Sequence, residues 1–230
     1  MESGILDTIP VQIDESVVMK RAHIRPDSPY AGDLHRMIEE ASRVAKPKAC
    51  YRLALIEERG PDWLMMDRIR FTSRVLVVNL EKTHRVFAYL GTCGMEVENW
   101  SRGVKDLLAE FWADTIKEVL LSLALEELAR HLDGTFKLAK TADMSPGSLE
   151  NWPIQQQTPL FTLLGDLVPA IGVRLTESLL MVPTKTVSGI RFATEESFAS
   201  CQLCPRQNCP GRRLPYQPEL YEAKYGIKNR

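Results

Sequence analysis

Residues 104–132 read VKDLLAEFWADTIKEVLLSLALEELARHL, and this stretch decides the fold class of the chain. Apolar residues recur in it at three- and four-residue spacing, which predicts a long helix with one buried face. The residues on that face are Val104, Leu107, Leu108, Phe111, Ile116, Leu120, Leu123, Leu128 and Leu132. We predict that the helix ends at Gly134, because glycine is a common residue at helix ends.

Strand patterns precede and follow this helix. Runs of branched and apolar residues predict strands over Tyr51–Ile56, Met66–Phe71, Val75–Leu80, Val86–Leu90, Leu179–Val182 and Ile190–Ala193. Shorter helices are predicted over Gly32–Ala45, before Lys46-Pro47, and over Pro159–Leu167, with a polar loop over Asp143–Gln157. Alternating strands with short connections favour antiparallel pairing. The prediction is therefore an α+β fold, with a twisted, mainly antiparallel sheet covered by helices.

Composition narrows the class of protein. The 230 residues are 44% hydrophobic and 26% charged with a net charge of −1, values that exclude wholesale disorder and collagen-like repetition. No apolar run is long enough to span a membrane, and the N-terminus lacks a basic leader with an apolar core, so we predict a cytoplasmic protein. The near-zero charge argues against a nucleic-acid partner.

Charge and proline divide the chain into two predicted parts, a single domain over residues 1–200 and an irregular tail over residues 201–230. The tail has six basic and two acidic residues, so it carries +4 and the other 200 residues carry −5. The basic residues Arg206, Arg212 and Arg213 are predicted to dock an acidic partner by charge complementarity, with solvated tail charge as the alternative.

Residues 172–190 read GVRLTESLLMVPTKTVSGI. This segment resembles the C-terminal activation domain of cobalamin-dependent methionine synthase, whose pattern there is G-x-[KR]-L-T-E-S-x-x-M-x-P-x-x-x-V-S-G. The matching positions are Gly172, Arg174, Leu175, Thr176, Glu177, Ser178, Met181, Pro183, Val187, Ser188 and Gly189.

Two further blocks resemble the same family. Ser145-Pro146-Gly147, with Trp152-Pro153 and Gln157, fits the S-P-G…W-P-x-x-Q form of its stand-alone anaerobe relatives. Upstream, Ala113-Asp114-x-Ile116-x-Glu118 fits an A-D-x-L-x-E pattern on the family's long helix. Residues 1–100 match only loosely, best at Tyr89–Gly94.

The resemblance implies an accessory component of cobalamin-dependent methionine synthase, in the methyltransferase class. The family domain binds S-adenosylmethionine and supports reductive remethylation of inactive cobalamin. Two partners are implied: a corrinoid-binding methionine synthase or methyltransferase subunit, and a reduced electron carrier of the flavodoxin or ferredoxin type. Cobalamin itself would arrive only with a partner, because the D-x-H-x-x-G signature that begins at Asp33 has Ile38 in place of the glycine.

The match also implies a site for S-adenosylmethionine. Glu118 matches the glutamate that pairs with the ammonium of the methionine portion. Ser145, Pro146 and Gly147 match a loop whose backbone contacts the nucleotide, and glycine permits such a close approach. By spacing alone, Glu118 is one more carboxylate on a solvated helix face, and Ser-Pro-Gly is an ordinary turn.

Asp143 departs from the family pattern. Methionine synthase has an arginine three residues before the motif proline, where it grips the substrate carboxylate, whereas an aspartate would repel that group. Either another cation, such as Lys140, Arg174 or Lys185, takes over, or the protein binds S-adenosylmethionine weakly or not at all. Arg174 and Glu177 belong to the predicted cofactor site, with a purely structural role as the alternative for Glu177.

Three of the five cysteines, Cys201, Cys204 and Cys209, lie within nine residues. In a reducing compartment this spacing predicts a metal or iron–sulfur centre before disulfides. Such centres usually take four protein ligands; Cys93 is the predicted fourth, with Cys50 and His131 as alternatives. A 4Fe–4S cluster suits the electron that the family's task requires, while zinc and unligated thiols stay open.

Three functions follow from these observations. The first is a stand-alone activation component that binds S-adenosylmethionine and supports cobalamin methylation on a separate corrinoid methyltransferase. The second is an iron–sulfur electron-transfer or docking module that no longer binds S-adenosylmethionine. Asp143 favours this interpretation. A zinc-stapled docking scaffold is a third.

Overall fold

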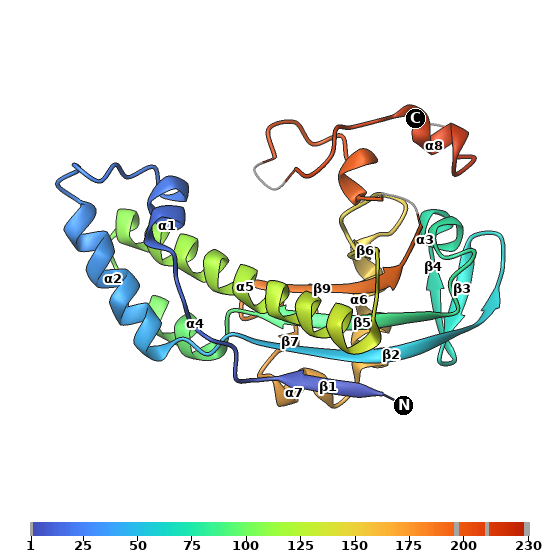
Figure 1. The fold of residues 1–230 in the computed structure, drawn as a ribbon, viewed down its shortest axis with the longest axis horizontal. Helices are drawn as coiled ribbons and strands as arrows, with labels where there is room; N and C mark the ends of the chain where they lie inside the picture. The colour runs from blue at the N-terminus through green and yellow to red at the C-terminus, as the bar shows by residue number, and fades with distance from the viewer. Residues whose placement is uncertain (1, 196–197, 210–211, 228–230) are drawn as a thin grey trace.

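The computed structural model describes residues 2–195, 198–209 and 212–227. These residues form a seven-stranded antiparallel sheet in the order β4-β3-β2-β5-β9-β6, with β1 paired to β2 (Figure 1). The strands are β1 Ser3–Leu6, β2 Lys48–Arg59, β3 Trp63–Met66, β4 Ile69–Thr72, β5 Arg85–Thr92, β6 Thr141–Met144 and β9 Thr186–Ala193. A separate two-stranded hairpin joins β7 Arg174–Leu175 to β8 Met181–Val182. The predicted α+β class with an antiparallel sheet is confirmed.

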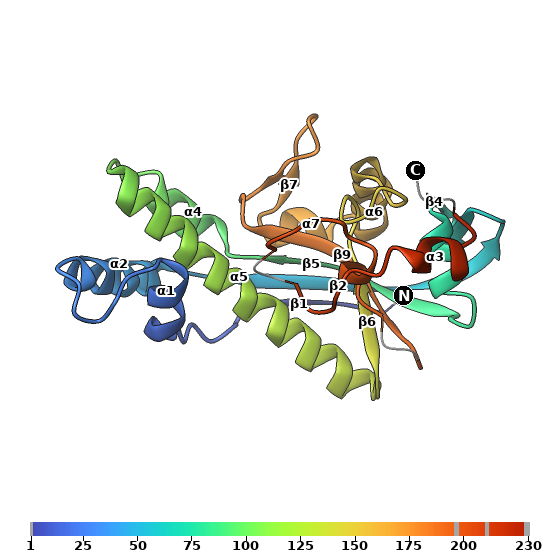
Figure 2. The ribbon, with the colours of Figure 1, turned by 90° about the horizontal axis from the view of Figure 1, so that it is seen from above.

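Helices cover both faces of the sheet. The 30-residue α5, Leu107–Phe136, runs along one face, and α6 Gln157–Leu164 and α7 Leu167–Ala170 lie on the other (Figure 2). The remaining helices are α1 Glu15–Arg21, α2 Ala31–Val44, α3 Arg74–Asn79, α4 Met95–Ser101 and α8 Glu219–Ala223, with short 3₁₀ turns at Ile154–Gln156 and Ser200–Gln202. Within the described residues, no helix combines the length and the apolar composition needed to cross a membrane.

The core consists of three hydrophobic clusters, and α5 joins two of them. Its first half packs Ile116 and Leu120 against α1, α2 and α4, and its second half packs Leu128 and Leu132 against the sheet. The opposite face of the sheet, with α3, α6 and the described part of the tail, encloses the third cluster around Trp152. Each fully buried leucine contributes about 1.5–3 kcal/mol, so α5 is held along most of its length.

The ends of α5 differ from the prediction. Asp106 caps the first turn, but Leu107 and Phe111 are exposed because that turn presents Trp112 to the interior instead. At the other end the helix continues past Gly134 to Phe136, and Lys137 adopts a left-handed conformation after it. The Phe136 ring packs against Phe87 with ring centroids 4.5 Å apart, and this contact holds the last turn in place.

Two predicted strands are wrong. Val75–Leu80 belongs to helix α3, whose N-cap Ser73 accepts a backbone N–H bond, since a short apolar run alone does not distinguish a buried strand from a buried helix. Met66–Phe71 spans a hairpin turn instead of one strand, because Asp67 and Arg68 both adopt positive φ between β3 and β4. The predicted helix over Gly32–Ala45 and the strands containing Tyr51–Ile56 and Val86–Leu90 are confirmed as α2, β2 and β5.

Candidate functional site

Strand β9 is where the three family-like blocks meet. Lys185, which immediately precedes β9, contacts Glu118 of α5. Ser188 lies 3.3 Å from Nε2 of Gln157, from the second block. Gly189 lies so close to Met144 at the end of β6 that a Cβ atom there would stand 2.7 Å from the Met144 carbonyl oxygen. Segments far apart in the sequence therefore converge on one strand.

At the start of β9, charged side chains alternate in sign from the interior to the surface. Lys117 Nζ lies 3.3 Å from Glu98 Oε2 and 3.5 Å from Asp114 Oδ1. Lys185 Nζ lies 2.7 Å from Asp114 Oδ2 and 2.8 Å from Glu118 Oε1. Each lysine thus bridges two carboxylates, and Glu118 lies at the exposed end of this series of charges.

Glu118 is the carboxylate of this group that can accept a further hydrogen bond. Its side chain is 49% exposed, and among the described residues its Oε2 atom has no hydrogen-bond partner. Glu98, by contrast, is buried and also binds Thr184 Oγ1 at 3.1 Å and approaches Arg102 at 4.0 Å. Burial alone would lower the pKa of Lys185, but the hydrogen bonds and charges of Asp114 and Glu118 outweigh burial and raise it. Lys185 therefore stays protonated, and Glu118 can accept another cation.

A second charged group lies farther along β9. Asp143 belongs to β6, not to the predicted loop, and it pairs across the sheet with Arg191. Arg191 Nη1 lies 2.6 Å from Asp143 Oδ2, and Arg191 also donates to both oxygens of Asp133, at 3.0 and 2.7 Å. Burial raises the pKa of Asp143, and the charges of Arg191 and of the tail residue Arg213 oppose that rise. Sequence reasoning missed Arg191, although its position two residues after Gly189 places it on the same face of β9.

The two charged groups are well separated. Glu118 and Asp133 are 15 residues apart on α5, which corresponds to about 22 Å. Lys185 and Arg191 are six residues apart along β9, or about 20 Å. The ammonium and carboxylate of an amino acid share one carbon atom, so one amino-acid group cannot bind at Glu118 and at Asp143 together. The expected repulsion between Asp143 and a substrate carboxylate therefore does not arise when the ammonium lies at Glu118.

The Ser145–Gly147 turn lies beside the middle of β9. Gly147 has a φ of +81°, and a Cβ atom there would stand 2.8 Å from Ile154 Cδ1, so the turn requires glycine. At Gly189, a Cβ atom would also stand 2.8 Å from the Tyr89 hydroxyl oxygen. Burial, followed by the charge of Asp143, raises the pKa of Tyr89, so this phenol stays neutral. Ser145 immediately follows Met144, which pairs with Ile190, so the turn begins beside β9.

Other residues of the predicted site lie elsewhere. Arg174 and Glu177 are exposed on the β7–β8 hairpin, which projects from the side of the sheet away from α5 (Figure 2). Lys140 donates to the backbone carbonyl of Glu195 at 3.1 Å and lines a cavity of about 940 Å³ near the C-terminal helix. The structure therefore does not bring Arg174, Glu177 or Lys140 together with Glu118, whereas it does bring Lys185 there.

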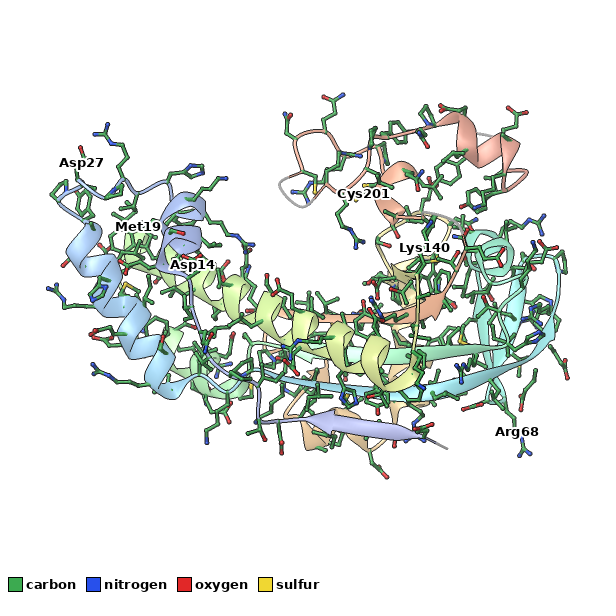
Figure 3. All side chains as sticks on the ribbon, in the orientation of Figure 1. Asp14, Met19, Asp27, Arg68, Lys140 and Cys201 are labelled. Carbon is green, nitrogen blue, oxygen red and sulfur yellow. The ribbon has the colours of Figure 1, made fainter. Side chains whose placement is uncertain are left out.

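The tail loop is organised around Arg212. The Arg212 guanidinium donates to the backbone carbonyls of Cys201 at 2.9 Å and Cys204 at 3.2 Å, and also to that of Arg206. Arg212 is thus occupied within the tail, while Arg206 and Arg213 are exposed. Figure 3 places Cys201 on the C-terminal segment, above the sheet and well apart from Asp14 on the α1 side.

The predicted metal ligands do not converge. Among the described residues, which include all five cysteines, no group of three or more His, Cys, Asp or Glu side chains could hold a metal ion. Cys93 is fully buried in the cluster around α2 and α5, whereas Cys204 packs on the cluster at the opposite face. Burial raises the pKa of Cys93 to about 12, which disfavours a thiolate there. Within the part of the chain that the structure describes, Cys93 therefore lies apart from the tail cysteines and does not complete a four-ligand site with them.

Comparisons with known proteins bear on the fold. No family model matches the chain, and no curated protein matches it. Among solved structures, a crystal structure of the MetH reactivation domain bound to AdoHcy is 13% identical, covers 87% of this chain and 81% of its own, and superposes with a TM-score of 0.55. At that identity the likeness concerns the fold. The chain resembles the MetH reactivation domain in fold, as the sequence blocks predict.

Proposed function

We propose that this chain is a stand-alone activation component that binds S-adenosylmethionine and supports reductive methylation of cobalamin held by a separate corrinoid methyltransferase. The observation that carries the proposal is the position of Glu118, a half-exposed carboxylate with an unused oxygen, in a fold similar to an AdoHcy-bound domain. The family-like blocks around β9 support the same assignment.

Each residue has a defined task in this proposal. Glu118 accepts the ammonium of the methionine portion, because a charge-assisted hydrogen bond is stronger than a neutral one. The backbone at Ser145–Gly147 contacts the nucleotide, where Gly147 permits a close approach. S-adenosylmethionine, when bound, supplies a methyl group on a sulfonium. The half-exposed position of Glu118 leaves the ligand accessible to a partner, and the protein contributes chiefly by holding it in orientation.

The proposed partners are a corrinoid-binding methionine synthase or methyltransferase subunit and a reduced flavodoxin-type or ferredoxin-type protein. A partner must bring the cobalamin, because the chain lacks the glycine of the corrinoid signature after Asp33. Arg206 and Arg213, which are exposed on the tail, are the basic residues proposed to meet an acidic partner.

Calorimetric titration with S-adenosylmethionine and AdoHcy tests the proposal. We expect the wild type to bind both and Glu118→Gln to bind about tenfold more weakly or worse, since a charged hydrogen bond is lost. Glu127→Gln is the matched control: Glu127 lies nine residues along the same helix, half a turn around from Glu118, and also pairs with a basic residue, Arg130. The proposal would be refuted if the wild type bound neither compound, or if Glu118→Gln and Glu127→Gln bound them equally well.

The cysteine-bearing tail supports a second candidate, an iron–sulfur electron-transfer or docking module that does not bind S-adenosylmethionine. Cys201, Cys204 and Cys209 share one loop that is shaped by Arg212. Iron, zinc and acid-labile sulfide in anaerobically purified protein test this candidate. It predicts iron and sulfide in wild type, lost in Cys204→Ser; zinc without sulfide would instead support the zinc-stapled scaffold.

A further inference from the structure

We infer that Lys185, Glu118 and Asp114 form a binding site for a complete α-amino-acid group, in which Lys185 holds the carboxylate and Glu118 the ammonium. The inference rests on the proposed function and deepens it, because it names the part of the ligand bound at the start of β9. It also assigns the ligand carboxylate to Lys185, because Asp143 lies with Arg191 about 20 Å away along β9.

The charges at this position match a zwitterion. Lys185 Nζ and Glu118 Oε1 are 2.8 Å apart, so one positive and one negative group lie side by side at the surface. An amino-acid group presents the opposite pair at a similar spacing. Lys185 has three N–H donors, and Asp114 and Glu118 use two of them. The third donor is available to a carboxylate, and the second oxygen of Glu118 is available to an ammonium.

Asp114 gives Lys185 its fixed position. Because Asp114 bonds both Lys117 and Lys185, it holds Lys185 when Glu118 turns to a ligand. Lys117 is buried, with its side chain only 9% exposed, and therefore anchors Asp114 from the interior. A ligand carboxylate would meet a lysine that is already oriented, which lowers the entropy cost of binding.

The backbone around Lys185 is also held in place. The Cys93 N–H donates to the Lys185 carbonyl at 3.0 Å. In the next residue, Thr186 Oγ1 lies 2.8 Å from the Pro183 carbonyl and 2.9 Å from Thr92 Oγ1. Hydrogen bonds thus fix the strand end that carries Lys185. A residue that orients a ligand needs a backbone held in this way.

Arg191 and Arg174 are not placed to bind this carboxylate. Arg191 already binds three carboxylate oxygens, from Asp133 and Asp143, and lies about 20 Å along β9 from Lys185. Arg174 projects with the β7–β8 hairpin on the other side of the sheet (Figure 2). The assignment of the carboxylate to Lys185 follows from position as well as from charge.

The site predicts a ligand preference. AdoHcy carries the whole amino-acid group, its decarboxylated analogue keeps only the ammonium, and 5′-methylthioadenosine has neither group. We expect wild-type affinity to fall in that order. Lys185→Met should weaken AdoHcy binding about tenfold, the usual effect of one charged hydrogen bond, and should leave 5′-methylthioadenosine binding unchanged. Lys185→Arg, which keeps the charge, should recover part of the loss.

Lys48→Met is the matched control. Its ammonium lies 3.1 Å from Glu96 and its side chain is 20% exposed, against 21% for Lys185, so each substitution removes a comparable ion pair. Lys48 pairs across the sheet with Thr92, which in turn pairs with Thr186, one residue beyond Lys185. Successive residues on a strand point to opposite faces, so Lys48 lies away from the proposed site.

The titrations separate the outcomes. If wild type binds none of the three compounds, the proposed function fails and this inference fails with it. If wild type binds AdoHcy and Lys185→Met binds it equally well, only the inference is overturned. A uniform loss for AdoHcy and 5′-methylthioadenosine would also overturn it, since that pattern indicates general distortion. Glu118→Gln, a smaller change, provides the same comparison for the ammonium if Lys185→Met does not fold.

Discussion

Replacing Arg191 with methionine removes the guanidinium that binds Asp133 and Asp143 together. Breaking a buried ion pair by deleting one partner costs about 3–5 kcal/mol. The side chain of Arg191 is only 11% exposed, but those of Asp143 and Asp133 are 25% and 36% exposed. Solvent therefore screens part of the loss, and we expect the free energy of unfolding to fall by about 2–3 kcal/mol. Methionine keeps an unbranched apolar stem, so loss of packing is a minor contribution.

Urea unfolding followed by circular dichroism at pH 7 measures this change. Asp143→Asn in the Arg191→Met background removes the buried charge and should recover about half of the deficit, because the unpaired carboxylate causes most of the cost. A deficit below about 0.5 kcal/mol, typical of surface substitutions, would refute the argument that Arg191 and Asp143 form a buried pair.

The pH dependence provides an independent check. Burial already raises the pKa of Asp143 in the wild type, and loss of Arg191 raises it further. A carboxyl group whose pKa is raised in the folded state loses stability as the pH increases through that value. The deficit of Arg191→Met should therefore be smaller at pH 5 than at pH 7. An equal deficit at both pH values would contradict the assigned cause.

Two further predictions concern the core. Burial raises the pKa of Cys50 and Cys93 from 9.0 to about 12, so the contribution of these thiols to the free energy of unfolding is intact below pH 9 and is lost as the pH rises towards 12, by about 1.4 kcal/mol per thiol at pH 10. Urea unfolding at pH 8 and pH 10 should therefore show a smaller loss of stability for Cys93→Ala than for the wild type. Equal losses would contradict the shift. Leu120 is fully buried and Leu107 is 84% exposed. Thermal or urea unfolding should therefore show that Leu120→Ala lowers the free energy of unfolding by about 3 kcal/mol and Leu107→Ala by less than about 0.5 kcal/mol. Similar losses for both variants would argue against the observed orientation of the first turn of α5.

The family-like blocks predicted the positions of several residues around β9, but not how those residues pair. The block predicts Glu118, and Lys185 is one of three cations that could take the place of the missing arginine. Their contact depends on α5 lying beside the start of β9, which no local pattern encodes. The pairing of Asp143 with Arg191 likewise depends on the β6–β9 register. Register depends on which residues of each strand face the buried side of the sheet, and this is decided by what packs on each face.

The cysteines show what spacing along the chain does not determine. Spacing along the tail predicts a common site, and the usual number of four ligands points to Cys93 as the fourth. The structure places Cys93 and Cys204 against different core clusters. In the tail itself, the Arg212 guanidinium binds the loop carbonyls. A short spacing in sequence places thiols on one loop, but only the fold determines which other side chains are close enough to complete a site.

The sequence by itself determined the α+β class, the long helix, most of the central strands and the likeness to an activation domain. These features depend on apolar periodicity and on local motifs, which a single chain displays directly. Only the tertiary structure decided that Val75–Leu80 is a helix, that Asp143 forms an ion pair with Arg191, and that Lys185 forms an ion pair with Glu118. Those outcomes depend on contacts between residues distant in sequence, where burial and charge pairing outweigh local preference.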